Sequence, residues 1–151
     1  MKRCAAIAIA LIVSCSAGPP RPANLDTRND VCASCRMPVS DASLAAQLVA
    51  RGEEPRFFDD IGCLRDYLSR TPSRRGSAAF VADHRTREWV PADRAVYTRA
   101  RIETPMGSRL IAHANAASRD ADPASAGGEP VAAAEAIGFA GARRSSGKEG
   151  R

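Results

Sequence analysis

The sequence predicts an α+β fold built from short strands and one clear helix. Between residues 31 and 113, short apolar stretches are separated by polar, glycine-containing or proline-containing turns, which is the pattern of strands. One segment has apolar residues at helical spacing, with Ile61, Leu64 and Leu68 on one face. Short strands interleaved with a helix are typical of a small mixed domain, here compatible with two tandem units of the ββα type.

The individual elements can be placed by their capping and turn residues. Asp59 or Asp60 is suited to cap the helix, and Pro72 ends it. Residues 43–50 are apolar without a clear period, so strand and helix both remain open there. His84 lies in a polar hairpin turn and is expected to be solvated. Strands are expected, in chain order, at residues 56–58, 78–82, 88–90, 95–102 and 110–113, with a short helix at 132–137.

Composition limits the core to the middle of the chain. Of 151 residues only 5% are aromatic, and six of the seven aromatic side chains lie between Phe57 and Tyr97. The folded domain is therefore expected at residues 30–113, with a small core that a cross-link or a metal would help to stabilise. Residues 114–140 are rich in alanine and glycine. They are expected to complete the second unit only weakly, and residues 141–151 to be disordered.

The N-terminus has the features of a bacterial lipoprotein signal. After a basic start, the apolar run at residues 5–13 is too short to span a bilayer. Residues 12–15, Ile-Val-Ser-Cys, match the pattern that lipoprotein signal peptidase cleaves. We therefore expect a signal peptide at residues 1–14, a lipid on Cys15 and a flexible tether over residues 15–29; a plain secretory signal is the alternative. The lipid would anchor the protein to a membrane, facing the periplasm, and the serine after Cys15 favours the outer membrane.

Charge and motifs exclude two broad classes of function. The formal charge of +5 falls by two, to +3, when Lys2 and Arg3 leave with the signal peptide. The remaining basic residues are nearly all arginines, scattered among acidic ones, without the basic stripe that nucleic-acid binding requires. There is no glycine-rich phosphate loop and no Ser/His/Asp arrangement. We predict neither a nucleic-acid partner nor an enzymatic activity.

Three thiols and two thioethers remain as soft metal donors after processing. Cys32, Cys35 and Met37 lie within six residues, and thiolate with thioether favours a soft ion, Cu(I) above all. In an extended segment the side chains of Cys35 and Met37 would point the same way and could share one ion. A second Cys-x-x-Cys pair is absent, so a structural zinc site is disfavoured.

Three further residues are candidate metal ligands. Cys63 falls in the first turn of the predicted helix, where the helix dipole favours the thiolate; a small buried side chain is the alternative. His113 ends an apolar strand and follows Met106 by seven residues, so either could complete a copper site. Otherwise His113 is an edge residue, and the turn around Met106 forms for backbone reasons.

Two other roles remain open for Cys32 and Cys35. In an exported chain the pair could form a structural disulfide, which would make the protein a lipid-anchored interaction module with one odd cysteine. The pair could also be a redox-active Cys-x-x-Cys. Thioredoxin-like motifs follow a strand and open a helix, and neither context is present here.

The chain contains three motifs in order, Cys32-x-x-Cys35-x-Met37, Phe58-Asp59-Asp60-Ile61-Gly62-Cys63-Leu64 and Thr104-Pro105-Met106-Gly107-Ser108, with Trp89 and Tyr97 between the last two. Over about residues 30–113 these motifs resemble those of the NosL family. Members of that family are copper-binding lipoproteins that accompany nitrous oxide reductase in denitrifying bacteria. The resemblance implies a periplasmic Cu(I) chaperone that hands copper to the apo-reductase for assembly of its copper–sulfide centre.

The resemblance also carries structural expectations. It implies a fold of two small ββα-type units, similar to that of organomercurial lyase. It implies that Cys35 and Met37 hold the copper. Two positions depart from the family's pattern, because its members tend to have glycine where Arg36 stands and often where Arg109 stands.

Overall fold

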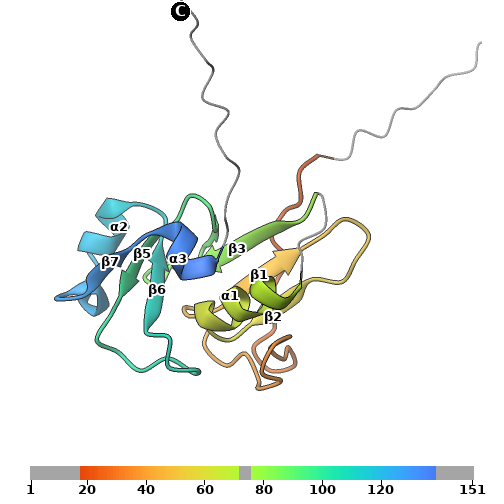
Figure 1. Cartoon of the computed structure of the whole chain (residues 1–151), viewed down its shortest axis with the longest axis horizontal. Helices are drawn as coiled ribbons and strands as arrows, with labels where there is room; N and C mark the ends of the chain where they lie inside the picture. The colour runs from red at the N-terminus through yellow and green to blue at the C-terminus, as the bar shows by residue number, and fades with distance from the viewer. Residues whose placement is uncertain (1–17, 72–75, 139–151) are drawn as a thin grey trace, which may run out of the picture.

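Two small antiparallel sheets, with helices packed on them, make up the fold and confirm the predicted α+β class (Figure 1). A computed structural model describes residues 18–71 and 76–138. The expected signal peptide, Cys15 and the tail at 141–151 lie outside these residues. In chain order the elements are β1 (Ala46–Val49), β2 (Arg56–Phe58), α1 (Ile61–Arg70), β3 (Ala78–Ala82), β4 (Trp89–Pro91), β5 (Val96–Arg99), β6 (Leu110–His113), α2 (Ala116–Asp120), the 3₁₀ turn η1 (Pro123–Ser125), β7 (Glu129–Val131) and α3 (Ala133–Ile137).

The first sheet has the strand order β2-β1-β3-β4, with every neighbouring pair antiparallel. Its central strand β1 shows that residues 43–50 contain a strand rather than a helix. Both flanking strands hydrogen-bond to β1, and Ala46 and Gln47 on its two faces are fully buried. Gly52 turns the chain from β1 into β2 with φ of 72°, a conformation that glycine adopts without strain. The predicted strand pair at 78–82 and 88–90 is confirmed as β3 and β4.

Buried Gln47 ties down part of the segment that was expected to be a tether. Its side-chain oxygen accepts from the backbone amide of Ala23 at 2.8 Å, and its amide donates to the carbonyl of Ala23 at 3.1 Å. Leu25 packs against the core beside this pair. A buried amide group with both of its polar atoms satisfied fixes the chain there rather than leaving it free.

The second sheet has the order β6-β5-β7, so in both sheets the first strand in sequence lies between the next two. Residues 114–138 contribute more to this half than their composition predicts. The short helix expected at 132–137 is confirmed as α3, whose Ala136 and Ile137 are fully buried. Strand β7 was not predicted because it contains Pro130. Proline is tolerated there because β7 pairs only with β5 and lies at the sheet edge.

The two halves are joined by helix packing and by the end of β3. Helix α1 contacts α3, and both lie on the same side of the two sheets in Figure 1. Just after β3, the amide of His84 donates to the carbonyl of Ala112 at 2.8 Å. Asp83 accepts from the amide of Ala114 at 2.8 Å. Within the described residues, no helix combines the length and apolarity needed to cross a bilayer.

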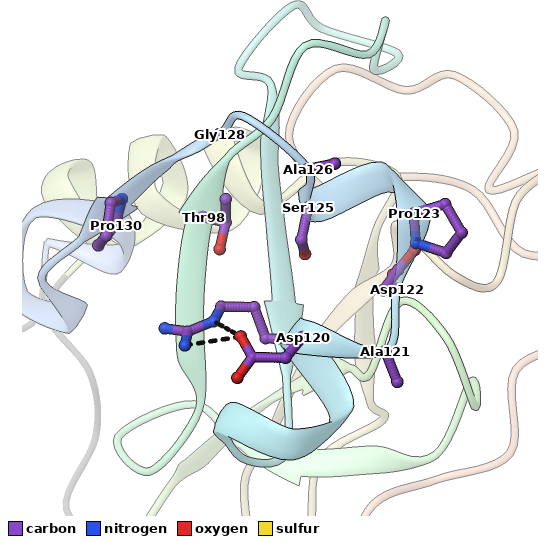
Figure 2. A pocket seen from close by; sticks show the side chains of 10 residues that line it. Thr98, Asp120, Ala121, Asp122, Pro123, Ser125, Ala126, Gly128 and Pro130 are labelled. Atoms are coloured by element: carbon purple, nitrogen blue, oxygen red, sulfur yellow. Dashed lines mark hydrogen bonds and ion pairs between the residues drawn. The ribbon is translucent and has the colours of Figure 1, made fainter.

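A pocket of about 510 Å³ lies where residues 119–128 pass over β5 (Figure 2). Arg119 and Asp120 form an ion pair at 2.8 Å on its wall. Thr98 and Ser125 also line it, and the hydroxyl oxygen of each is buried with no hydrogen-bond partner among the residues described. This polar lining belongs to the half of the molecule that carries α2 and β7.

Candidate metal centre

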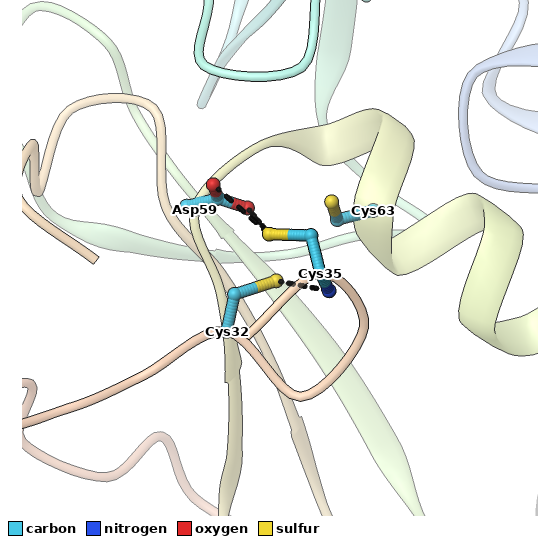
Figure 3. Close-up of side chains that lie close together, drawn as sticks. All are labelled: Cys32, Cys35, Asp59 and Cys63. Atoms are coloured by element: carbon cyan, nitrogen blue, oxygen red, sulfur yellow. Dashed lines mark hydrogen bonds between the residues drawn. The ribbon is translucent and has the colours of Figure 1, made fainter. Parts of the chain in front are cut away.

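Three thiols and one carboxylate converge between the N-terminal loop, the end of β2 and the start of α1 (Figure 3). The donor atoms of Cys32, Cys35, Asp59 and Cys63 all lie within 4.8 Å of one another. We call these four residues the thiol cluster. All three cysteines are free thiols. The structure thus brings together all three of the cysteines predicted as ligands, and it adds Asp59.

The loop that carries Cys32 and Cys35 is a tight turn held against β2. The amide of Cys32 donates to the carbonyl of Met37 at 2.8 Å, and the amide of Arg36 to the carbonyl of Cys32 at 3.0 Å. Ala33 docks the turn onto β2 by donating to the carbonyl of Phe57 at 2.8 Å. Within the turn, the amide of Cys35 donates to Sγ of Cys32 at 3.5 Å.

Residues 35–37 are not extended, and an extended segment is the condition under which Cys35 and Met37 would point the same way. Arg36 has φ of 69°, in the left-handed region, and this reverses the chain between Cys35 and Met37. Alternation of side chains along a strand therefore does not bring Cys35 and Met37 together. Met37 is 56% exposed at the surface, whereas Cys35 is only partly exposed.

The paired aspartates before α1 have separate roles. Asp60 is the helix cap, and its Oδ1 accepts from the amide of Gly62 at 2.6 Å. Asp59 is 2% exposed and accepts from Sγ of Cys35, with its two oxygens at 3.4 and 3.5 Å. Sequence reasoning gave both residues a capping role and missed Asp59. A signal for Asp59 was present in the sequence. One aspartate is enough to cap a helix, so the second aspartate needs another role.

Burial makes the thiols of Cys35 and Cys63 weak acids. Burial is the main cause that raises the pKa of Cys35, with contacts to Cys32 and Asp59 adding to it and the amide of Met37 opposing it. Burial also raises the pKa of Cys63, and Asp59 and Cys32 add to that shift. The expectation that the helix dipole makes Cys63 a thiolate is therefore wrong. Desolvation and a neighbouring carboxylate outweigh the dipole at this position.

Of the other predicted ligands, His113 is not a member of the thiol cluster. His113 is fully buried and belongs to a second group, with His84 and Asp122. Met106 is 53% exposed, and its backbone amide donates to Oδ2 of Asp60 at 3.0 Å. The prediction that His84 is solvated is wrong, because its side chain is 18% exposed and bonds Asp122 at 2.7 Å.

The donor set of the thiol cluster suits a soft metal ion. Three sulfur donors select copper, zinc or iron–sulfur chemistry over hard cations. Cys32 and Cys63 are 0% and 4% exposed, while Cys35 is partly open to solvent. An ion held here would be covered on one side and reachable from the other.

Comparison with known protein families identifies the family of this chain. Searches among curated proteins and among solved structures find no match. A family model described as NosL matches residues 22–138, which include both sheets and the whole thiol cluster. NosL proteins are copper-binding accessory proteins, and a cysteine cluster able to hold a metal is in keeping with that role. Because the match covers most of the chain, the protein belongs to the NosL family.

Proposed function

We propose that this protein is a periplasmic Cu(I) carrier that delivers copper to nitrous oxide reductase for assembly of its copper–sulfide centre. The observation that carries the proposal is the convergence of three free thiols, one of which reaches the surface. Membership of the NosL family supports the reductase as the acceptor in this proposal. Copper is the cargo here, so the site must both hold it and release it.

The proposed transfer begins at Cys35. It is the partly exposed thiol of the cluster, and Met37 lies two residues away with an exposed thioether. A donor on the acceptor protein can reach copper at this edge and bond to it before Cys35 leaves. Cys32 and Cys63, buried behind it, would hold the ion during the exchange. Exposed Met106 is the remaining candidate for an additional ligand.

The charge of the thiol cluster favours a bound cation. Asp59 is buried beside Cys35, so a thiol that ionises places a negative charge next to a buried carboxylate. Such a pair of like charges is costly unless a cation neutralises it. Cu(I) bound by thiolates would supply positive charge at this position, and the choice of Cu(I) rests on the soft sulfur donors.

Localisation and anchoring belong to the same proposal. A lipid on Cys15 would hold the protein at a membrane surface facing the periplasm, where the reductase matures. Between Cys15 and β1 lie about thirty residues. Of these, the part from Ala23 onward is bound to the folded domain, so the free tether in our proposal is shorter than residues 15–29.

An anaerobic Cu(I) titration against a competing chelator tests the proposal. We expect one tightly bound copper per chain, a large loss of affinity in Cys35→Ser and a smaller loss in Met37→Leu. Met106→Leu tests the second candidate thioether ligand in the same way, because Met106 is an equally exposed methionine on a different loop. Binding without a tight site, or binding that Cys35→Ser leaves unchanged, would contradict the proposal. Transfer to the apo-reductase would then be measured from copper-loaded protein.

Thiol redox activity of Cys32 and Cys35 is the competing function. The raised pKa of Cys35 makes this thiol a weak nucleophile near neutral pH. The structure also has both residues as free thiols, rather than as the disulfide of a structural module. A reductase-coupled assay that finds turnover independent of Met37 would support the redox function instead.

A further inference from the structure

Two histidines and an aspartate form a second cluster in the other half of the fold. Nδ1 of His84 lies 2.7 Å from Oδ2 of Asp122, and Nε2 of His113 lies 2.9 Å from the same oxygen. These three donor atoms all lie within 4.8 Å of one another. We call His84, His113 and Asp122 the imidazole–carboxylate cluster. It shares no residue with the thiol cluster.

Three separate segments of the chain position this cluster. His84 follows β3, and its backbone amide is fixed to the carbonyl of Ala112. His113 is the last residue of β6. Asp122 follows α2, and its Oδ1 accepts from the amide of Ala124 at 2.9 Å, which leaves Oδ2 to face both rings. Backbone contacts thus hold each of the three donors in place.

Stability alone does not explain the cluster. His113 is fully buried, yet its Nδ1 has no hydrogen-bond partner among the described residues. A buried polar atom without a partner costs about 1–3 kcal/mol, and apolar residues of similar volume at such positions are often as stable or more stable. Both imidazole rings bond the same oxygen of Asp122, so one acceptor atom is shared by two histidine side chains.

The donor types identify the class of ligand. Two imidazole nitrogens and one carboxylate oxygen are the protein ligands of many zinc sites with an open fourth position. Without a thiolate or thioether, the set does not favour Cu(I). Burial opposes ionisation of Asp122, but the bonds from His113, His84 and Ala124 lower its pKa, so it can act as an anionic ligand.

We propose that the imidazole–carboxylate cluster binds a divalent cation of the Zn²⁺ class through Nδ1 of His84, Nε2 of His113 and the carboxylate of Asp122. An ionised carboxylate only accepts hydrogen bonds, so both rings now donate to it. The cation would replace the two ring protons that face Asp122, one on Nδ1 of His84 and one on Nε2 of His113. On each ring the proton moves to the other nitrogen, which for His113 is the unpartnered Nδ1. Neither ring needs to change its net charge.

The cation would reach the site from the side of His84. That side chain is 18% exposed, whereas His113 is 0% exposed. Asp122 also lines the pocket of about 510 Å³ beside β5, so the bound ion would lie at the border of that pocket. A cation here would link the end of β3, the end of β6 and the chain after α2.

Zinc titration of the full-length protein, followed by NMR of the imidazole nitrogens, tests this site directly. With one equivalent of Zn²⁺ we expect the signals of both histidines to shift, and the proton of His113 to move from Nε2 to Nδ1. Asp122→Asn should weaken Zn²⁺ binding by at least about tenfold, since loss of even an outer partner of a zinc ligand has that effect. Asn can still cap η1 through its side-chain oxygen, so the variant keeps the local backbone bond.

Asp120→Asn is the matched control, because Asp120 is an exposed carboxylate two residues away. Its Zn²⁺ affinity should equal that of the unchanged protein. Co²⁺ separates the two clusters, because thiolate ligands give strong charge-transfer bands and imidazole–carboxylate ligands do not. Imidazole signals that do not respond to Zn²⁺, or that respond equally in Asp122→Asn, would overturn the proposal. Since these signals report on His84 and His113 alone, the result stands whether or not the thiols bind Cu(I).

Discussion

Asp60 accepts a hydrogen bond from the backbone amide of Met106 at 3.0 Å, across 46 residues of the chain. The same carboxylate caps α1 through Gly62 and accepts from the hydroxyl of Thr104 at 2.7 Å. Burial opposes ionisation of Asp60, but a hydrogen bond from Ser108, together with these three bonds, lowers its pKa, so the carboxylate is ionised. The start of α1, which carries Cys63, is thereby joined to the turn of the third family motif.

Loss of the Asp60 carboxylate should destabilise the fold. Asp60→Ala removes a helix cap and leaves the donors of Thr104 and Met106 unpaired, which together predict a loss of about 2–4 kcal/mol. Urea unfolding of the reduced protein measures it. Asp66→Ala is the matched control, because Asp66 is an exposed aspartate of the same helix, with 54% of its side chain exposed. Equal losses in the two variants would contradict a special role for Asp60.

Gly62 should resist the substitution that usually stabilises a helix. Glycine to alanine inside a helix normally gains up to about 1 kcal/mol. A Cβ at Gly62 would, however, lie 2.8 Å from Cβ of Ser108 and 3.0 Å from Oδ1 of Asp60. We expect Gly62→Ala to lower the unfolding free energy by about 1–3 kcal/mol, as overpacking does.

A second variant identifies the cause of that loss. Ser108→Gly removes the Cβ that Gly62→Ala would meet. In a double-mutant cycle measured by urea unfolding, the two changes should therefore be less damaging together than the sum of their separate effects. Additive losses would show that the close approach of the two residues is not responsible.

Three arginines among the described residues stand where the backbone favours glycine. Arg36, Arg87 and Arg109 have φ of 69°, 63° and 58°, and the resemblance to NosL proteins gives glycine where Arg36 stands and often where Arg109 stands. A left-handed conformation costs a non-glycine residue about 1–2 kcal/mol. Replacement by glycine removes this strain but makes the unfolded chain more flexible, which offsets part of the gain in stability. We expect Arg109→Gly to raise the unfolding free energy by about 0.5–1 kcal/mol. Arg94→Gly, in a turn without positive φ, should lower it.

Local signals were enough to predict most of the elements. Asp60 and Pro72 bracket α1, and the polar turn between residues 82 and 89 separates two paired strands. By contrast, β7 was missed because its sequence, Glu-Pro-Val, carries an edge-tolerated proline and little apolar character. Helix α2 was missed because its five residues have one buried side chain, Ser118, and no apolar stripe.

The thiol cluster was predicted in composition but not in geometry. Donor type alone selected Cys32, Cys35 and Cys63, because soft side chains are few in this chain. Their meeting depends on the docking of Ala33 onto Phe57, a contact between segments that no local pattern encodes. The same limit applies to His113. Its partner Asp122 lies beyond α2, a helix that was not predicted, so the sequence offered no reason to pair them.

Asp59 should make Cys35 less reactive. Its carboxylate contributes to the raised pKa of Cys35, after burial and the contact with Cys32. Asp59→Asn removes that negative charge, so the pKa should fall and more thiolate should be present at a fixed pH near 8. We expect iodoacetamide to alkylate Cys35 about threefold faster or more, since the thiolate is the reacting species. Mass spectrometry of the Cys35 peptide measures this rate, and Asp66→Asn should leave it unchanged.

The pH dependence of Cu(I) affinity should count the thiol ligands. Because burial raises the pKa values of Cys35 and Cys63, both thiols carry protons near neutral pH before copper binds. Each thiol that becomes a ligand must release its proton, so the copper-loaded protein binds fewer protons and affinity rises with pH. Mass action predicts about a tenfold increase per pH unit for each such thiol, as long as the pH stays below its pKa. With two cysteine ligands, the Cu(I) affinity would rise about a hundredfold per pH unit. Cys35→Ser should reduce the number of protons released on copper binding by one. Copper titrations between pH 6 and 8, corrected for the chelator's own protonation, measure how steeply the affinity depends on pH. A Cu(I) affinity that does not change with pH would exclude protonated thiols as the copper ligands.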